Sequence, residues 1–233
     1  MDFGPEQGIG ALRRERLRNA RLYFVCDARP GGEDPEPLLR AALDGGVDIV
    51  QLREKEAPTR VIERAAGIFR RVCDTYGVPF IVNDDPELAV ALNADGVHVG
   101  QDDVAVADAR RAIGPDRLLG LSTHSEAQIA AAHETSRADR IDHISVGPVW
   151  ETPTKAGRPA VGLELVRHAA AAATLPFFAI GAIDPDNVAQ VLAAGARRIC
   201  VVRALRDSAD PAATARSLRR AFAAVGAEVA PGG

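Results

Sequence analysis

The stretch VPFIVNDDPELAVALNADGVHVG, residues 78–100, contains one full repeat of a pattern that recurs along the whole chain. It begins with the apolar run PFIVN (79–83) and ends with a second run, DGVHVG (95–100). Both runs are rich in the β-branched and aromatic residues that favour strands. Because a helical segment separates them, the stretch predicts a strand, a helix and a strand in one parallel βαβ unit.

The helix inside this repeat has recognisable ends. Asp85 followed by Pro86 is typical of a helix start, because an aspartate N-cap accepts a first-turn N–H and proline suits the first helical position. The pair predicts a helix over 86–92. In the turn NADGV that follows, we expect Gly96 to take the positive φ that ends a helix.

The same alternation of strand and helix runs through the rest of the chain. The expected strands cover residues 21–27, 47–53, 79–83, 95–100, 117–122, 141–147, 176–181 and 198–203. The expected helices lie near residues 35–44, 59–75, 86–92, 104–112, 126–135, 163–173, 185–193 and 210–224. The strands are nearly continuous apolar runs, as expected when both faces of a sheet are covered.

The number of units predicts the fold class. A doubly wound open sheet would give a similar pattern, but no GxGxxG follows the first strand, so the sequence favours a single-domain α/β fold, the (β/α)₈ or TIM barrel. The barrel is expected over residues 21–225. Residues 1–20 are expected to form an N-terminal extension, partly disordered or a short helix, and residues 226–233 a flexible tail.

Composition excludes several classes of partner. The 233 residues carry a formal net charge of −4, which argues against binding to nucleic acid or acidic membranes, since both need a basic face. The longest apolar runs, about ten residues, are too short to span a bilayer. Three cysteines without a CxxC pair indicate buried reduced thiols in a cytoplasmic protein. A homo-oligomer remains an open alternative.

Polar residues gather at one end of the predicted strands. In such barrels the active site is built from the carboxyl ends of the strands and the loops that follow. Those ends carry cations, carboxylates, amides and hydroxyls, namely Gln51 to Lys55, Asn83 to Asp85, Gln101 to Asp103, Ser122 to His124, Gly181, Ala182, Val202 and Arg203. The opposite ends carry ordinary turn residues. The asymmetry predicts an active site at one mouth.

The chemistry of this mouth indicates an anion and a metal ion. Gln51, Arg53 and Lys55 alternate along an extended segment, so their side chains face one side and form an anion clamp. Asp84 and Asp103 follow neighbouring strands and can converge on one hard cation. Mg²⁺ is usually held by one or two carboxylates with substrate phosphates, so these residues predict Mg²⁺ bound with a pyrophosphate.

Some of these residues also have structural interpretations. Asp85 is better read as the cap of its helix than as a ligand, because Pro86 follows it. Asp102 and Asp103 both stand where a cap belongs, so one can cap while the other binds metal. Glu54 can pair with a neighbouring cation.

The sequence offers no clear nucleophile or general base. His98 and His124 lack a serine or cysteine constellation, and nothing distinguishes His133, His143 or His168. Ser122 is not surrounded by a G-x-S-x-G elbow, which argues against acyl transfer.

With these residues assembled, the sequence resembles the thiamine-phosphate synthase family from about residue 20 to 225. The resemblance rests on QLREK, ND, GQDD, LSTHS, GPVWETPTK with GLE after it, AIGAI and VVRA. It implies a pyrimidine diphosphate site at Gln51, Leu52, Arg53, Glu54, Lys55, Asn83, Ser122 and Lys155. It implies a thiazole phosphate site at Thr152, Pro153, Thr154, Gly181, Ala182, Val202 and Arg203, and Mg²⁺ ligands at Asp84 and Asp103.

The family's reaction joins the pyrimidine and thiazole halves of thiamine phosphate, with pyrophosphate as the leaving group. The resemblance implies two small-molecule substrates and catalytic roles for Arg53, Lys55, Lys155 and Ser122. Two alternatives are a thiazole tautomerase-like paralogue that shares the fold, and a non-catalytic regulator that binds thiazole phosphate or thiamine phosphate. The first should have lost the clamp or the metal pair.

Two positions depart from the family's usual pattern. Ala182 stands where the family usually has glycine, and Arg203 where it often has serine. If the φ of Ala182 is positive, its backbone is strained by about 1 kcal/mol or more.

The irregular segment VGPVWETPTKAGRPAVG, residues 146–162, is expected to be a loop that organises both substrates, either as a lid that closes or as a fixed wall. Its Trp150 has two interpretations, a wall beside the substrate rings or a hydrophobic plug under the loop.

Overall fold

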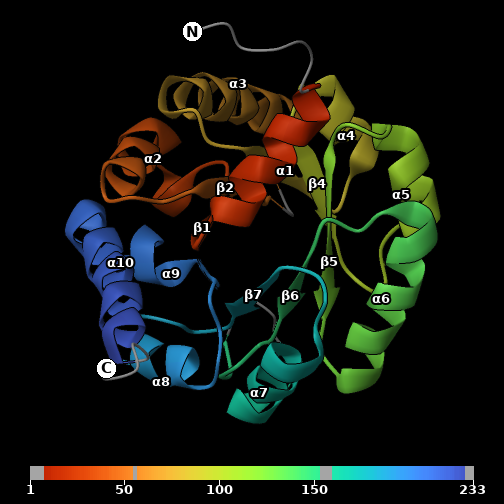
Figure 1. The fold of residues 1–233 in the computed structure, drawn as a ribbon. Helices are drawn as coiled ribbons and strands as arrows, with labels where there is room; N and C mark the ends of the chain where they lie inside the picture. Colours follow the sequence, from red (N-terminus) through yellow and green to blue (C-terminus); the bar gives the residue numbers. More distant parts are fainter. Residues whose placement is uncertain (1–7, 55–56, 153–158, 229–233) are drawn as a thin grey trace, which may run out of the picture.

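The computed structural model describes residues 8–54, 57–152 and 159–228, with side chains up to residue 224. Eight parallel strands pair in chain order and close into one barrel, so the predicted TIM barrel is confirmed (Figure 1). The strands are β1 (Leu22–Cys26), β2 (Ile49–Leu52), β3 (Phe80–Asn83), β4 (Gly96–Val99), β5 (Leu118–Thr123), β6 (His143–Val146), β7 (Phe177–Ile180) and β8 (Ile199–Val201).

The helices surround this barrel. They are α1 (Ile9–Asn19), α2 (Pro35–Asp44), α3 (Thr59–Tyr76), α4 (Pro86–Ala91), α5 (Val106–Ile113), α6 (Glu126–Asp139), α7 (Gly162–Ala172), α8 (Val188–Ala193), α9 (Arg203–Arg206) and α10 (Pro211–Glu228), with a 3₁₀ turn at Pro30–Gly32. The short α9 was not predicted. Helix α8 begins three residues later than expected, because the carboxylate of Asp184 accepts the N–H groups of Asp186 and Asn187 and forms a turn there.

The repeat at residues 78–100 contains one correct and one wrong prediction. Asp85 caps α4, since its carboxylate accepts the N–H of Leu88 at 2.9 Å. The residue with positive φ in the turn is Asn93 (φ 50°), not Gly96. Gly96 begins β4 instead, where a Cβ would lie 2.4 Å from the carbonyl oxygen of Leu118. That glycine allows close packing of β4 against β5.

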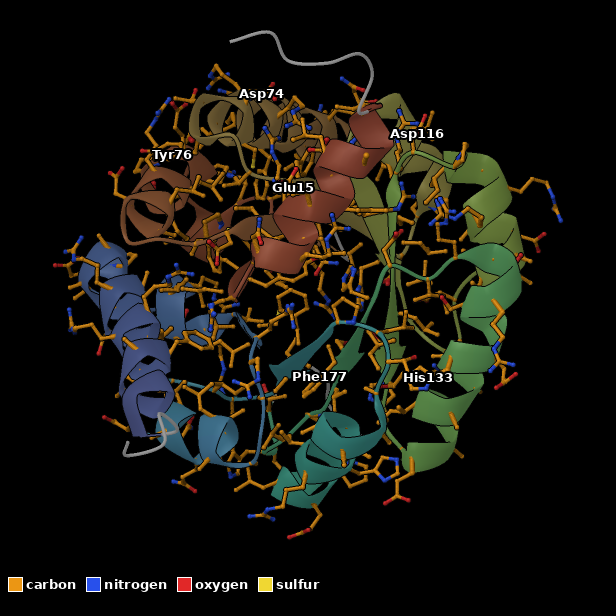
Figure 2. All side chains as sticks on the ribbon, in the orientation of Figure 1. Glu15, Asp74, Tyr76, Asp116, His133 and Phe177 are labelled. Atoms are coloured by element: carbon orange, nitrogen blue, oxygen red, sulfur yellow. The ribbon has the colours of Figure 1, made fainter. Side chains whose placement is uncertain are left out.

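Two apolar layers follow from the alternation of side chains along each strand. One layer lies between the strands and the helices and includes Phe24, Leu52, Phe69 and Phe80. The other fills the barrel interior and consists of Leu17, Ala20, Tyr23, Val25, Ile49, Ile81, Leu118, Phe178 and Cys200. Side chains fill the space on both sides of the strands (Figure 2). No helix in the described ranges is long and apolar enough to cross a membrane.

The amino ends of the strands carry more than ordinary turn residues, so that prediction was wrong. Asp48, Asp95 and Asp142 each stand immediately before an even-numbered strand. Each carboxylate accepts a backbone N–H from the neighbouring odd-numbered strand, at 2.9 Å in all three cases, the donors being Leu22, Phe80 and Leu119. Arginines complete each site: Arg219 at Asp48, Arg13 and Arg70 at Asp95, and Arg14 and Arg110 at Asp142.

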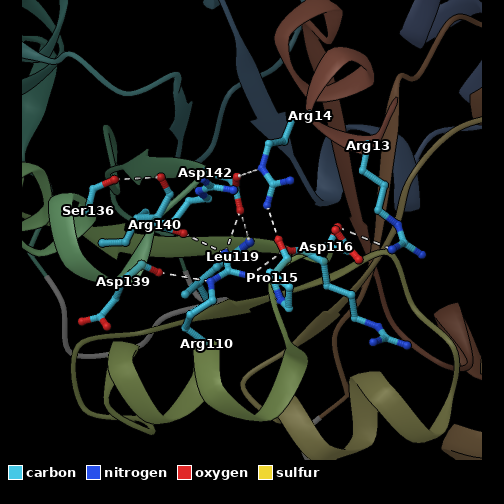
Figure 3. A network of polar contacts seen from close by, with 12 residues as sticks. Arg13, Arg14, Arg110, Pro115, Asp116, Leu119, Ser136, Asp139, Arg140 and Asp142 are labelled. Atoms are coloured by element: carbon cyan, nitrogen blue, oxygen red, sulfur yellow. Dashed lines mark hydrogen bonds and ion pairs between the residues drawn. The ribbon is translucent and has the colours of Figure 1, made fainter. Parts of the chain in front are cut away.

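Helix α1 closes this end of the barrel (Figure 1). Arg13 and Arg14 donate from Nε to Asp95 and Asp142, each at 2.8 Å, and Figure 3 shows Arg14 and Arg110 meeting on Asp142. At its other end, the carbonyl of Arg18 accepts from Arg198, the residue before β8, at 2.9 Å. Because Leu17 packs into the interior layer, α1 is an integral part of the barrel floor.

Candidate active site

A pocket of about 320 Å³ opens at the carboxyl ends of the strands. Nine residues that the sequence assigned to the site line it: Gln51, Arg53, Asn83, Ser122, Thr152, Gly181, Ala182, Val202 and Arg203. These residues come from β2, β3, β5 and the segments after β6, β7 and β8. The closed barrel therefore brings both halves of the predicted site into one cavity.

The clamp side of the pocket is formed by β2 and β3. Gln51 is buried, and Nε2 of its side-chain amide donates to Oδ1 of the Asn83 side chain at 3.4 Å. Arg53 lies two residues beyond Gln51 on the same face, half-buried at the pocket wall. An amide pair beside a guanidinium can bind an anion from two directions.

Several predicted residues lie elsewhere. Leu52 points into the outer apolar layer, as the alternation along β2 requires. The carboxylate of Glu54 accepts the N–H of Ala28 at 3.3 Å and is therefore directed toward the segment after β1. Lys55, Pro153, Thr154 and Lys155 lie outside the described residues.

The two predicted metal ligands follow β3 and β4 but do not line the pocket. Asp84 has a positive φ of 65°, its N–H donates to the carbonyl of His98 at 2.8 Å, and it lines a shallow depression with Asp85 and Asp108. One oxygen of Asp103 accepts the N–H of Gly100 at 2.6 Å. Asp102 and Asp103 do not cap α5, whose first helical residue is Val106, after Ala105.

The chemistry of this pair fits Mg²⁺. Both groups are hard oxygen donors that follow neighbouring strands at the mouth, and Mg²⁺ typically takes one or two carboxylates while waters and phosphates complete its shell. Within the described ranges, no cluster of three or more His, Cys, Asp or Glu side chains could hold a metal ion alone. The two carboxylates would therefore need waters or a bound anion to complete the coordination of the ion.

The side of the pocket opposite the clamp consists of two backbone turns, which follow β7 and β8. After β7, Gly181 has a φ of 119° and Ala182 a φ of 51°. A Cβ on Gly181 would lie 2.5 Å from the backbone nitrogen of Val149, so glycine allows this turn to touch the segment after β6. After β8, Val202 precedes α9 and its carbonyl accepts the N–H groups of Leu205 and Arg206, so the N–H groups of Arg203 and Ala204 have no acceptor within the helix.

The comparisons with known proteins agree with this geometry. Residues 22–205 match the protein family described as thiamine monophosphate synthase. The chain belongs to the thiamine monophosphate synthase family. A thiamine-phosphate synthase from Thermobifida fusca is 48% identical over 215 residues, covering 92% of this chain and 97% of the relative. A second, from Thermus thermophilus, is 50% identical over 206 residues, covering 85% of this chain and 95% of the relative.

A solved structure of thiamine phosphate pyrophosphorylase from Pyrococcus furiosus superposes with a TM-score of 0.79 at 30% identity. The match covers 91% of this chain and 98% of that one. As a member of the thiamine monophosphate synthase family, the chain is an enzyme of the transferase class.

The sequence predicted backbone strain at Ala182 if its φ is positive, and its φ is positive. Alanine in the left-handed region costs about 1 kcal/mol more than glycine, because its Cβ approaches the carbonyl oxygen. The carbonyl of Ala182 accepts from the amide of Asn187 at 2.8 Å, and this bond helps to hold the turn. This member of the thiamine monophosphate synthase family thus keeps a glycine-like turn without the glycine.

The loop after β6 has a closed base. Val161 and Gly162 donate their N–H groups to the carbonyls of Pro148 and Val149 at 2.8 and 3.1 Å, so the two ends of the loop meet. Trp150 packs against the outer apolar layer and does not line the pocket, which supports the plug interpretation over the wall.

Sequence reasoning missed the deep wall of the pocket, lined by Tyr23, His98, His143, Ser145, Phe178 and Cys200. The prediction considered only the ends of strands, whereas these side chains project inward from strand positions below the mouth. Their signal was the period-two alternation: Ser122 on β5 is inward-facing, and so is Gly120. Applied to β4 and β6, the same alternation identifies His98, His143 and Ser145 as inward-facing residues.

Proposed function

We propose that the chain is a thiamine-phosphate synthase that condenses 4-amino-2-methyl-5-(diphosphooxymethyl)pyrimidine with 4-methyl-5-(2-phosphoethyl)thiazole and releases pyrophosphate. One observation carries the proposal: a single pocket joins the clamp at Gln51, Arg53 and Asn83 to the turns at Ala182 and Arg203. The two groups suit a diphosphate and a monophosphate, and a substitution reaction needs both substrates in one cavity.

The pyrimidine diphosphate would bind along β2 and β3. In the proposed reaction the bond between the pyrimidine methylene carbon and the diphosphate oxygen breaks, and its electrons leave with pyrophosphate. The ring nitrogen of the thiazole then attacks the carbon. Arg53, with Lys55 and Lys155 in the roles that the family implies, would stabilise charge on the departing pyrophosphate.

Asp84 and Asp103 would hold Mg²⁺, which when bound neutralises part of the diphosphate charge. The turns after β7 and β8 would orient the thiazole phosphate by main-chain N–H groups. Val25, Phe178 and Ile180 give the pocket an apolar wall, and this wall would keep water from the electron-poor carbon. The chain would act in the cytoplasm on small molecules alone.

The test is pyrophosphate release from the two substrates, with and without Mg²⁺. We expect release that needs both substrates and that ends when a chelator removes the metal. Asp84→Ala and Lys155→Ala should each lower kcat by about 100-fold or more, the scale of losing one preorganised electrostatic group.

Asp108→Asn is the matched control, because Asp108 is an exposed carboxylate in the same shallow depression as Asp84, paired with Arg111. It should retain turnover close to that of the wild type. Near wild-type kcat in both Asp84→Ala and Lys155→Ala would remove the proposed roles. Wild-type protein that binds thiazole phosphate without releasing pyrophosphate would be a regulator or an isomerase.

A further inference from the structure

Four buried polar side chains form a connected group in the deep wall of the pocket. Nδ1 of His98 lies 3.3 Å from Nε2 of His143, and Nε2 of His98 lies 3.0 Å from the hydroxyl oxygen of Ser122. The hydroxyl of Ser145 lies 3.4 Å from both His98 Nε2 and the Ser122 oxygen. These residues come from β4, β5 and β6, so the group crosses three strands.

The backbone makes room for the contact between the two imidazoles. Gly120 lies on β5, between the strands that carry them. A Cβ at Gly120 would lie 2.3 Å from Nδ1 of His98 and 2.4 Å from Nε2 of His143, at the two atoms that meet. Any larger residue would separate the rings, so glycine at this position preserves the pair.

The imidazole of His143 is neutral at physiological pH. Burial lowers the pKa of His143 to about 4, against a smaller upward effect of Asp142. A neutral imidazole carries one N–H and one lone pair, so its two nitrogens have opposite hydrogen-bonding roles. The contact with His98 therefore allows two arrangements of donors and acceptors, here called settings. Each setting determines whether Ser122 presents a hydrogen-bond donor or only an acceptor to the pocket.

In the first setting His143 donates from Nε2 to His98, and His98 donates from its own Nε2 to Ser122. Ser122 then accepts from His98 and from the hydroxyl of Ser145, which uses both of its lone pairs. Its own hydrogen is left to point into the pocket. In the second setting the two histidines exchange donor and acceptor roles. Ser122 then donates its single hydrogen to Nε2 of His98 while it still accepts from Ser145, so only a lone pair faces the pocket.

The far nitrogen of His143 distinguishes the two settings. Nδ1 of His143 is buried and has no hydrogen-bond partner within the described residues. Among buried backbone groups an unpaired N–H is rarer than an unpaired acceptor, and we apply the same preference to the imidazole nitrogen. Nδ1 is therefore the lone pair and Nε2 carries the hydrogen, which is the first setting.

We propose that His143 and His98 are positioning residues that fix the hydroxyl of Ser122 as a hydrogen-bond donor to the pocket. Ser122 then selects a substrate group that accepts a hydrogen bond, such as an aromatic ring nitrogen. The assignment of that group to the pyrimidine substrate rests on the proposed function, whereas the direction of the relay does not.

A double-mutant cycle tests whether His143 acts through Ser122. His143→Phe should lower kcat/KM for the pyrimidine diphosphate by about 5-fold, the factor of one neutral hydrogen bond. In a Ser122→Ala background the same change should have no further effect. His143→Gln, which keeps an N–H donor near Nε2, should stay within about twofold of the wild type. Equal losses in both backgrounds, without rescue by glutamine, would overturn the positioning role.

The direction of the relay is measured without substrates. In ¹⁵N-histidine-labelled protein, long-range ¹H–¹⁵N correlations distinguish the two neutral tautomers, and the His143→Gln spectrum identifies the signals of residue 143. We expect His143 and His98 both to carry the hydrogen on Nε2. A hydrogen on Nδ1 of His143 would overturn the relay. Absence of pyrophosphate release by the wild-type enzyme would instead overturn the proposed function and leave the tautomer result standing.

Discussion

Ala182 holds a left-handed backbone, with a φ of 51°, in the turn that forms one wall of the pocket. Strain of this kind persists where the surroundings determine the conformation, here through the amide of Asn187 and the contact of Gly181 with the segment after β6. At the scale of single residues, the mouth and the deep wall thus contain groups in unfavourable states, a strained alanine and a buried imidazole.

Ala182→Gly should raise the free energy of unfolding by up to about 1 kcal/mol, because glycine adopts positive φ without steric cost. Urea denaturation measures the change. The matched control is Ala171→Gly in α7, an exposed helical alanine, which should lower stability by a similar amount. Loss of stability in both variants would show that Ala182 is not strained.

His143 should make stability depend on pH. Its folded pKa of about 4 lies below that of an unfolded histidine, so the unfolded state binds more protons between about pH 6.5 and pH 4. Stability is therefore fully present above this window and is lost as the pH falls through it, by about 2 kcal/mol at pH 5. Urea unfolding at pH 7 and pH 5 measures the loss. Between pH 7 and pH 5, the His143→Gln variant should lose about 2 kcal/mol less stability than the wild type. An equal loss in both proteins would refute the low pKa of His143.

At the scale of elements, the aspartates before β2, β4 and β6 join pairs of strands from below. Although burial raises it, the N–H of Phe80 and the guanidinium groups of Arg70 and Arg13 hold the pKa of Asp95 below its ordinary value. The side chain of Asp142 is only 4% exposed, and it also accepts from one backbone N–H and two guanidinium groups. The amino ends of the strands therefore carry stability, whereas the carboxyl ends carry the pocket.

Arg14→Gln should lower the free energy of unfolding by about 1–3 kcal/mol, because it leaves the buried carboxylate of Asp142 with fewer donors. Arg18→Gln is the charge-matched control on the same helix, since the Arg18 side chain is exposed. Urea denaturation of both variants measures the difference. Equal effects would mean that the ion pair at Asp142 contributes nothing specific.

At the scale of the whole molecule, the two ends of the barrel can be separated by experiment. A chain that starts at Ala20 loses α1, exposes part of the interior layer and removes Arg13 and Arg14, so it should lose several kcal/mol of stability. Because the pocket lies at the other end, KM for both substrates at low temperature should stay within about threefold of the wild type. A large rise in KM with unchanged stability would contradict this division.

The sequence predicted the barrel because eight apolar strands and their helices repeat a local signal that tertiary packing reinforces. It predicted much of the pocket lining because closure forces strand ends to one mouth. The alternation along β4 and β6 indicates that His98, His143 and Ser145 face inward, but no local motif predicts that they touch, because only the register of three adjacent strands brings them together. The floor was missed for the same reason, since Asp142 and Arg14 are 128 residues apart.

The position of α1 has a consequence for biosynthesis. This helix is translated long before its partners: Asp95 lies 82 residues after Arg13, Asp142 lies 128 after Arg14, and Arg198 lies 180 after Arg18. Contacts this distant in sequence form slowly and only after the intervening chain exists. We therefore expect α1 to complete its contacts only after residue 198 has been synthesised. Until then we expect Leu17, which packs in the interior layer with Cys200 of β8, to stay exposed on the unfinished chain and open to recognition by chaperones.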